Sequence, residues 1–200
     1  MTHPICIGIT GASGAIYAVR LLEVLRASGR DVHLSISPSG RDVIRQELGL
    51  AVDLDNFRLE SLLPAVDSRG KIEYFQWQDF MAPMASGSFL TGGMVICPTS
   101  GTTLSAVAAG AAGNLIQRAA EVHLKERRKL VLVPRETHLS LAHIDNMRRV
   151  TEAGAVVLPA SPGWYHGVRD VSDLVDFVIA RICDQLGIEQ HLTKRWGEKT

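Results

Sequence analysis

Two glycines near the start of the chain lie where a phosphate group can bind. The segment GITGASGAIYAVRLL, residues 8–22, places Gly11 and Gly14 between a β-branched apolar run and a segment with helical spacing. Glycines allow a tight turn, and the unpaired N–H groups and dipole of a helix start favour an anion. The segment lacks a Walker lysine and departs from the GxGxxG dinucleotide fingerprint. We interpret it as a site for a phosphate or a polar ribityl chain, with plain helix packing as an equal alternative.

A serine follows the next apolar run of the chain. In many NAD-binding folds the end of the second strand carries Asp or Glu, which binds the ribose hydroxyls. Here the corresponding segment reads SISPSG and offers Ser37. Because a hydroxyl donor suits a phosphate better than a ribose diol, this position favours a mononucleotide over NAD.

A second group of hydroxyls occurs in the segment CPTSGTTLSAV. Ser100, Gly101, Thr102 and Thr103 stand directly after an apolar run and before an Ala/Gly-rich segment. Their hydroxyl and amide groups are expected at the end of a buried strand, which strengthens the prediction of a phosphate-containing ligand. The Ala/Gly-rich segment itself, residues 106–113, is interpreted as close helix packing.

Two cations further along the chain are spaced to project from one helix face. Arg118 and Lys125 are seven residues apart, about two helical turns. They could bind a second phosphate. The alternative is a solvated helix with an i,i+4 ion pair between Glu121 and Lys125, and periodicity alone favours that alternative.

Charged and aromatic residues also follow the last two apolar runs. Arg135 and Glu136 come directly after residues 130–133, and Tyr165 comes after residues 155–158. An arginine at a strand end can hold a phosphate through its planar guanidinium, and the adjacent carboxylate can carry protons. Near the end of the chain, Trp196 stands in a polar tail and is expected to pack on another group.

The elements that must position these residues form an alternating pattern. Continuous apolar runs, typical of strands covered on both faces, alternate with segments of helical spacing. The runs occupy residues 5–9, 32–36, 94–97, 130–133 and 155–158. Residues 49–90 are interpreted as an excursion from the sheet with a short strand at residues 72–75. In open parallel sheets ligands bind at the carboxyl ends of the strands, where the residues named above stand.

Composition limits the function classes. A chain of 200 residues is expected to form one domain, and 21 basic against 21 acidic residues argue against partners such as nucleic acid or a membrane surface. The cysteines, Cys6, Cys97 and Cys183, have no CxxC spacing, and the first residues lack a targeting pattern, so a soluble, cytoplasmic protein is expected. The histidines form no metal-ligand pattern, and no GxSxG motif supports a hydrolase.

The order of the motifs resembles a known family. The segments SGSF, RAAEVHLKERRKLVLVPRE, GAVVLPASPGWYH, DLVDFVIARICDQLGI and RWGE, together with the two loops above, resemble the UbiX/Pad1 flavin prenyltransferases over nearly the whole chain. The resemblance implies a Rossmann-like (flavodoxin-like) three-layer α/β fold with a parallel sheet that binds FMN. It also implies a homo-oligomer, typically a dodecamer, with active sites at subunit contacts.

The resemblance further implies a reaction. Such an enzyme joins the dimethylallyl group of dimethylallyl phosphate to N5 and C6 of reduced FMN, without a metal. The product, prenylated FMN, serves a UbiD-type decarboxylase. The leaving phosphate must then be neutralised by protein cations, and the allyl cation needs a water-free, electron-rich enclosure.

The resemblance also assigns site residues. Ser13 and Glu47 are placed near flavin N5 and, with Glu136, form the catalytic set. The expected FMN-binding residues are Thr10, Gly11, Ala12, Ser37, Ser100, Gly101, Thr102, Thr103 and Arg135. The residues expected around the prenyl phosphate are Arg118, Lys125, Glu136, Tyr165 and Arg181, with Trp196 as a wall of the prenyl pocket. Phe80 stands where some members carry tryptophan, which leaves the pocket shape open.

Two other functions remain open at this point. An FMN-dependent cysteine decarboxylase of similar fold would need a histidine base near the flavin, and none follows the glycine turn or the second apolar run. A non-catalytic FMN carrier would explain the glycine turn and the hydroxyl loop. It would leave Arg118, Lys125 and Arg181 without a purpose.

Overall fold

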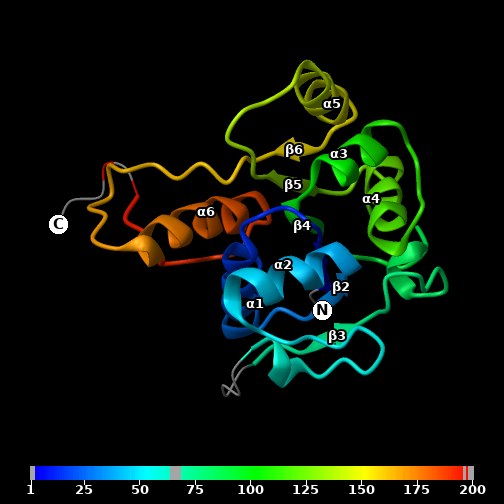
Figure 1. The fold of residues 1–200 in the computed structure, drawn as a ribbon, viewed down its shortest axis with the longest axis horizontal. Helices are drawn as coiled ribbons and strands as arrows, with labels where there is room; N and C mark the ends of the chain where they lie inside the picture. Colours follow the sequence, from blue (N-terminus) through cyan, green and yellow to red (C-terminus); the bar gives the residue numbers. More distant parts are fainter. Residues whose placement is uncertain (1–2, 64–68, 196, 198–200) are drawn as a thin grey trace.

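Six parallel strands form a single sheet in the order β3-β2-β1-β4-β5-β6 (Figure 1). The computed structural model describes residues 3–63, 69–195 and 197. The strands are β1 (Ile5–Ile9), β2 (Val32–Ile36), β3 (Ile72–Tyr74), β4 (Met94–Thr99), β5 (Leu130–Pro134) and β6 (Val156–Val157). The sheet grows from β1 to β3 in one direction and from β4 to β6 in the other. This reversal between β1 and β4 creates a crevice at the carboxyl edge, where doubly wound folds bind their ligands.

Helices cover both faces of the sheet. One face carries α1 (Ala15–Ala27), α2 (Pro38–Leu48) and α6 (Val171–Gln185), and the other carries α3 (Gly101–Ala108), α4 (Leu115–Lys125) and α5 (Leu141–Glu152). Short 3-10 turns, η1 (Leu59–Ser61) and η2 (Pro83–Ala85), flank β3. The Rossmann-like three-layer fold expected from the sequence is therefore confirmed.

Successive side chains of a strand point to opposite faces of the sheet, so the hydrophobic core has two parts, one on each face. In β1, Ile5, Ile7 and Ile9 pack with the α1 and α6 side, whereas Cys6 packs with the α4 side. Gly8 lets α4 approach closely, because a Cβ at this position would lie 2.6 Å from Cγ2 of Ile116. The continuous apolar run is required because both faces of the strand are buried.

The boundaries of four predicted strands differ from the structure, by one residue in β3 and β5 and by two in β4 and β6. β4 continues to Thr99, because the Thr99 hydroxyl accepts a hydrogen bond from the backbone N–H of Val133 and ties β4 to β5. β6 is shorter than residues 155–158 and pairs only with β5. The strand expected at residues 72–75 is present as β3. It pairs with β2, so the interpretation of residues 49–90 as an excursion is wrong for this part.

Among the residues that the structure describes, no helix combines the length and apolar character needed to cross a bilayer.

Candidate active site

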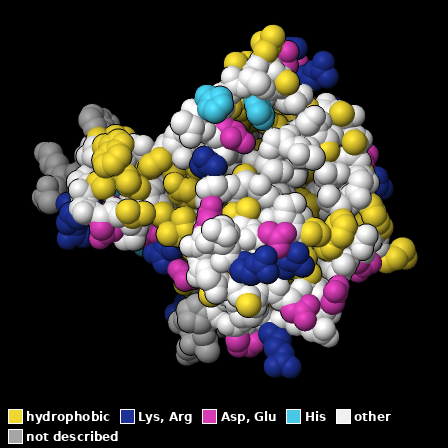
Figure 2. Space-filling model, in the orientation of Figure 1, with side chains coloured by type: hydrophobic (Ala, Val, Ile, Leu, Met, Phe, Trp, Pro, Cys, Tyr) yellow, Lys and Arg dark blue, Asp and Glu magenta, His cyan; other side chains and the backbone are white. Residues whose placement is uncertain are grey.

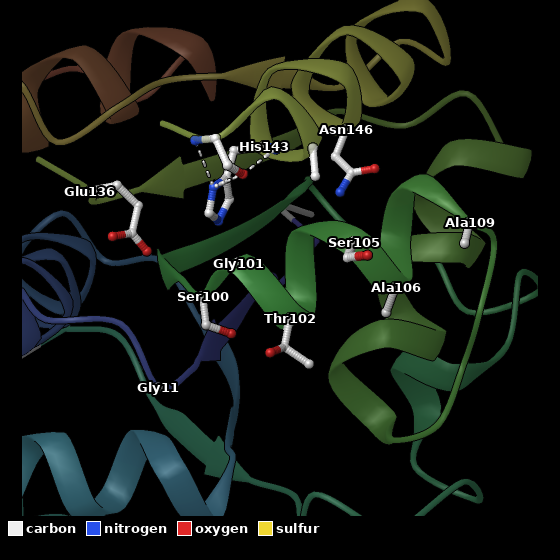
Figure 3. A pocket seen from close by; sticks show the side chains of 12 residues that line it. Gly11, Ser100, Gly101, Thr102, Ser105, Ala106, Ala109, Glu136, His143 and Asn146 are labelled. Atoms are coloured by element: carbon white, nitrogen blue, oxygen red, sulfur yellow. Dashed lines mark hydrogen bonds between the residues drawn. The ribbon is translucent and has the colours of Figure 1, made fainter. Parts of the chain in front are cut away.

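A cavity of about 770 Å³ opens at the carboxyl edge of the sheet, between α3 and the start of α5 (Figure 3). Small and hydroxyl-bearing side chains dominate its walls. It is lined by Gly11, Ser100, Gly101, Thr102, Ser105, Ala106, Ala109, Glu136, Ser140, Ala142, His143 and Asn146. In the space-filling view, histidine and acidic side chains gather at the foot of α5, beside this edge (Figure 2).

A buried hydroxyl network fixes the wall made by α3. The Thr10 hydroxyl donates to the Pro98 carbonyl at 2.8 Å and accepts from the Ser100 N–H at 2.8 Å. Ser100 begins α3 by accepting from the Thr103 N–H, and its hydroxyl also bonds to that of Thr103. Both threonines are buried: the Thr10 hydroxyl links the ends of β1 and β4, and the Thr103 hydroxyl fixes Ser100 at the start of α3. Gly101 and Thr102 face the cavity.

The glycine turn holds an anion that the protein itself supplies. The Glu47 carboxylate accepts from the Gly14 N–H at 3.1 and 2.9 Å and from the Ala15 N–H at 2.8 Å. Gly14 has φ of 111°, which aims these groups at the carboxylate. The turn was predicted to bind a phosphate, and in the structure Glu47 takes the place of that anion at these two N–H groups. The N–H groups of Gly11 and Ser13 have no hydrogen-bond partner among the described residues.

Glu47 stays ionised because of these contacts. Burial alone would raise the pKa of Glu47, but hydrogen bonds from the Ser13 side chain and from the backbone of Ala15 and Gly14 hold this pKa below its ordinary value. The Arg135 guanidinium acts in the same direction. Since the Arg135 Nε also donates to the Ser13 carbonyl at 3.2 Å, the structure brings Ser13, Glu47 and Arg135 together.

The ends of β1 and β2 form one continuous rim. Ser37 begins α2 by accepting from the Gly40 N–H at 3.0 Å. The turn after β1 touches the start of α2, because a Cβ at Gly11 would lie 2.4 Å from Cβ of Ser39. Ala12 is buried beneath the turn, and its N–H donates to the Thr10 carbonyl. The rim therefore presents backbone and serine groups beside the cavity.

Arg118 and Lys125 lie on the α4 side, next to the SGSF loop. Arg118 donates to the Ala85 carbonyl at 3.2 Å and pairs with Glu121 at 2.6 Å. Lys125 pairs with Glu126, so the ion pair expected between Glu121 and Lys125 is not formed.

Arg181 and Tyr165 lie on the opposite face of the sheet. Arg181 pairs with Asp184 at 3.0 Å, and its guanidinium carbon is 5.7 Å from the centre of the Phe177 ring. Tyr165 packs edge-on against the same ring. Within one chain the five residues expected around the prenyl phosphate are therefore not brought together. Trp196 lies outside the described residues.

Several cavity residues were missed by the sequence analysis. Ser140, His143 and Asn146 line the α5 wall, although no chemical motif singles them out. A helix-start pattern, Ser140 followed three residues later by a side chain that bonds back to it, was the available signal. In the described parts of the chain no cluster of three or more His, Cys, Asp or Glu side chains is arranged to hold a metal ion.

Comparison with known proteins identifies the family. The model of the Flavoprotein family matches residues 1–183. The flavin prenyltransferase UbiX of Pseudomonas aeruginosa is 49% identical over 197 residues, which cover 98% of this chain and 94% of that protein. The chain belongs to the UbiX flavin prenyltransferase family.

Solved structures of UbiX proteins share the fold over their whole length. AnUbiX (PadA1), in complex with FMN and dimethylallyl pyrophosphate, superimposes with a TM-score of 0.86 at 34% identity, covering 100% of both chains. A dodecameric FMN-dependent UbiX-like decarboxylase from Escherichia coli O157:H7 has a TM-score of 0.83 at 36% identity, covering 98% of this chain and 100% of that one.

Proposed function

We propose that this chain is a flavin prenyltransferase. It joins the dimethylallyl group of dimethylallyl phosphate to N5 and C6 of reduced FMN and releases phosphate. The observation that carries the proposal is the 49% sequence identity with a UbiX protein over 98% of this chain. The cavity at the switch point of the sheet provides a place for the reaction.

The residues present fit FMN. The cavity of about 770 Å³ has room for a tricyclic ring, and its lining contains hydroxyls and small side chains. The FMN phosphate would bind at the rim, where Ser37 and Arg135 stand beside the unpaired N–H groups of Gly11 and Ser13. This placement keeps the phosphate away from the helix start that Glu47 occupies.

The side chains can move the protons of the reaction. Reduced FMN, when bound, supplies the nucleophile. Glu47 is held ionised beside Ser13, so the Ser13 hydroxyl could take the proton released at flavin N5 and at the same time pass its own proton to Glu47 Oε. Glu136 lines the cavity and can exchange a proton with the allylic group there. We assign no metal, because the cations of the protein would neutralise the leaving phosphate.

The divided cations imply that neighbouring subunits complete the site. Arg118 and Lys125 lie on one face of the sheet, and Tyr165 and Arg181 lie on the other. The segment from β6 to α6 extends from the body (Figure 1) and exposes Trp164 by 70%, with hydrophobic side chains gathered over it (Figure 2). We infer a homo-oligomer, a dodecamer by analogy with the UbiX-like protein above, in which this segment reaches another subunit.

We also propose where the enzyme works and which protein receives its product. The free cysteines Cys6, Cys97 and Cys183 are all buried, which suits a cytoplasmic enzyme. Residues 1–200 are taken as one domain around the single sheet. The product is assigned to a UbiD-type decarboxylase partner.

Anaerobic incubation with reduced FMN tests the activity. The purified protein receives either dimethylallyl phosphate or the diphosphate, with a metal chelator present, and mass spectrometry weighs the released flavin. We expect a gain of one C5H8 unit. No gain with either donor refutes the proposal, and a gain only without chelator refutes the metal-free mechanism. Lys125→Ala should retain FMN and lose prenylation, whereas a carrier would show no prenylation in any form.

Subunit complementation tests the shared site. Lys125→Ala and Arg181→Ala should each be inactive alone. Oligomers assembled from a mixture of both should regain part of the activity, because some sites then receive both native cations. A mixture as inactive as the single variants would show that one chain supplies all the cations.

A further inference from the structure

His143, the third residue of α5, lines the cavity. Its ring packs against the first turn of α3, because a Cβ at Gly101 would lie 2.6 Å from His143 Nε2 (Figure 3). The His143 ring fits in this position because residue 101 is a glycine and has no side chain. Ser100, Thr102 and Glu136 line the same cavity (Figure 3).

Ser140 sets which ring nitrogen carries the proton. The backbone N–H of Ser140 donates to His143 Nδ1 at 3.3 Å, and the Ser140 hydroxyl lies 2.9 Å from the same nitrogen. A backbone N–H can only donate, so Nδ1 accepts and the neutral ring carries its proton on Nε2. No described residue forms a hydrogen bond with Nε2. His143 therefore brings to the cavity wall an N–H donor that lies beside Gly101 and has no acceptor among the described residues.

The lining indicates what this donor meets. Among the residues that the structure describes, no arginine or lysine lines the cavity, and Glu136 is its acidic residue. The hydroxyls, small side chains and neutral imidazole donor of the cavity suit an uncharged heterocycle with carbonyl oxygens and ring nitrogens. The Arg135 guanidinium and the N–H groups of Gly11 and Ser13 at the rim suit a phosphate better, so we place the ring system in the cavity and the phosphate at the rim.

We propose that His143 is a flavin-binding residue that donates its Nε2 hydrogen to an acceptor of the isoalloxazine ring. The inference rests on the proposed function, since it presumes that the cavity takes FMN. The capping interaction with Ser140 fixes the tautomer and the ring orientation, so the donor is in place before the ligand arrives.

Three substitutions separate the donor from the helix cap. His143→Gln keeps an acceptor for the Ser140 N–H and an amide donor for the cavity. His143→Glu keeps the acceptor, as in an ordinary capping box, but has no donor. His143→Leu has neither. His138→Gln is the matched control, because His138 is exposed on the loop before α5 and does not line the cavity.

Flavin titration of the oligomeric proteins gives the readout. Quenching of flavin fluorescence measures affinity, and the visible absorption bands report hydrogen bonding to the ring. We expect the Gln and control variants to bind FMN within about threefold of the parent. The Glu and Leu variants should bind about tenfold more weakly, with shifted absorption bands, as expected for one lost hydrogen bond. Melting temperature and oligomer size of the Glu variant should match those of the parent.

Titration with riboflavin shows whether His143 contacts the flavin ring or the phosphate. Because riboflavin has no phosphate, the same weakening should appear with it. Equal affinity of the parent, Glu and Leu variants for FMN overturns the inference, as does a loss with FMN that is absent with riboflavin. A parent that binds neither flavin overturns both proposals. A parent that binds flavin without prenylating it overturns the proposed function and leaves the His143 contact to be judged by the titration.

Discussion

Replacing Glu47 by glutamine tests how the start of α1 is stabilised. α1 has no side-chain cap of its own, since Gly14 occupies the N-cap position and the first turn contains no acidic residue. Glu47, from α2, supplies both the acceptor and the negative charge. A lost cap costs about 0.5–2 kcal/mol, and an anion at an exposed helix start contributes about 0.3–1 kcal/mol.

The two contributions set the expected magnitude. Glu47→Gln keeps one oxygen and loses the charge, so we expect a loss of about 1 kcal/mol in the free energy of unfolding at neutral pH. Glu47→Ala loses both, for about 2 kcal/mol. For a chain of this size these losses lower the melting temperature by roughly 2–4 °C per kcal/mol.

The pH dependence gives the sharper test. The pKa of Glu47 is lower in the folded than in the unfolded protein, so its contribution is complete above the unfolded value of 4.5. It is lost as the pH falls through the folded value. The difference in stability between the parent and Glu47→Gln should therefore be constant from about pH 7 to pH 5 and shrink below about pH 4.

Denaturation by urea across this pH range measures the difference. Glu152→Gln is the control, because Glu152 forms an exposed i,i+4 pair with Arg148 that should contribute little. If Glu47→Gln behaves like the control at neutral pH, or if its deficit does not change on acidification, Glu47 does not act as an ionised cap and the reasoning fails.

Three further predictions concern other parts of the fold. Burial lowers the pKa of His123 to about 4, so the unfolded chain binds a proton that the folded one does not, and stability should fall from about pH 6.5 toward pH 4. His123→Gln should remove on the order of 2–3 kcal/mol of this loss in the free energy of unfolding, measured by urea denaturation at each pH. Arg128 donates to the carbonyls of residues 87 and 89, and because lysine cannot reach both, Arg128→Lys should speed amide exchange of residues 86–90 by mass spectrometry. Gly40→Ala would place a Cβ 2.7 Å from the Ile9 carbonyl, so α2 must shift and urea denaturation should show a loss of about 1–3 kcal/mol.

The fold could be predicted from local patterns because each strand is buried on both faces. Such strands must be apolar at every position, so residues 5–9, 32–36 and 130–133 are visible in the sequence. Their carboxyl ends meet at one edge, which places Ser100 and Glu136 at a common cavity without further information. β6 was less sharply bounded, because it is an edge strand of two half-buried residues.

The candidate site depended on contacts that sequence spacing does not encode. Glu47 has the pattern of an exposed helical carboxylate, and its partners are 32 and 33 residues away. His143 lines the cavity only because α5 packs on α3. Arg118 and Arg181 both looked like members of one cation cluster, but the sheet separates them.

The sequence by itself determined the order of strands and helices, the edge of the sheet that binds ligands, and the family. These depend on short-range apolar periodicity and on motifs that stay contiguous. The tertiary structure decided which anion the glycine turn binds, which hydroxyls are buried and which donor faces the cavity. Those outcomes depend on how α2 and α5 pack against the sheet, and the direction of a side chain is fixed only when its distant partners are in place.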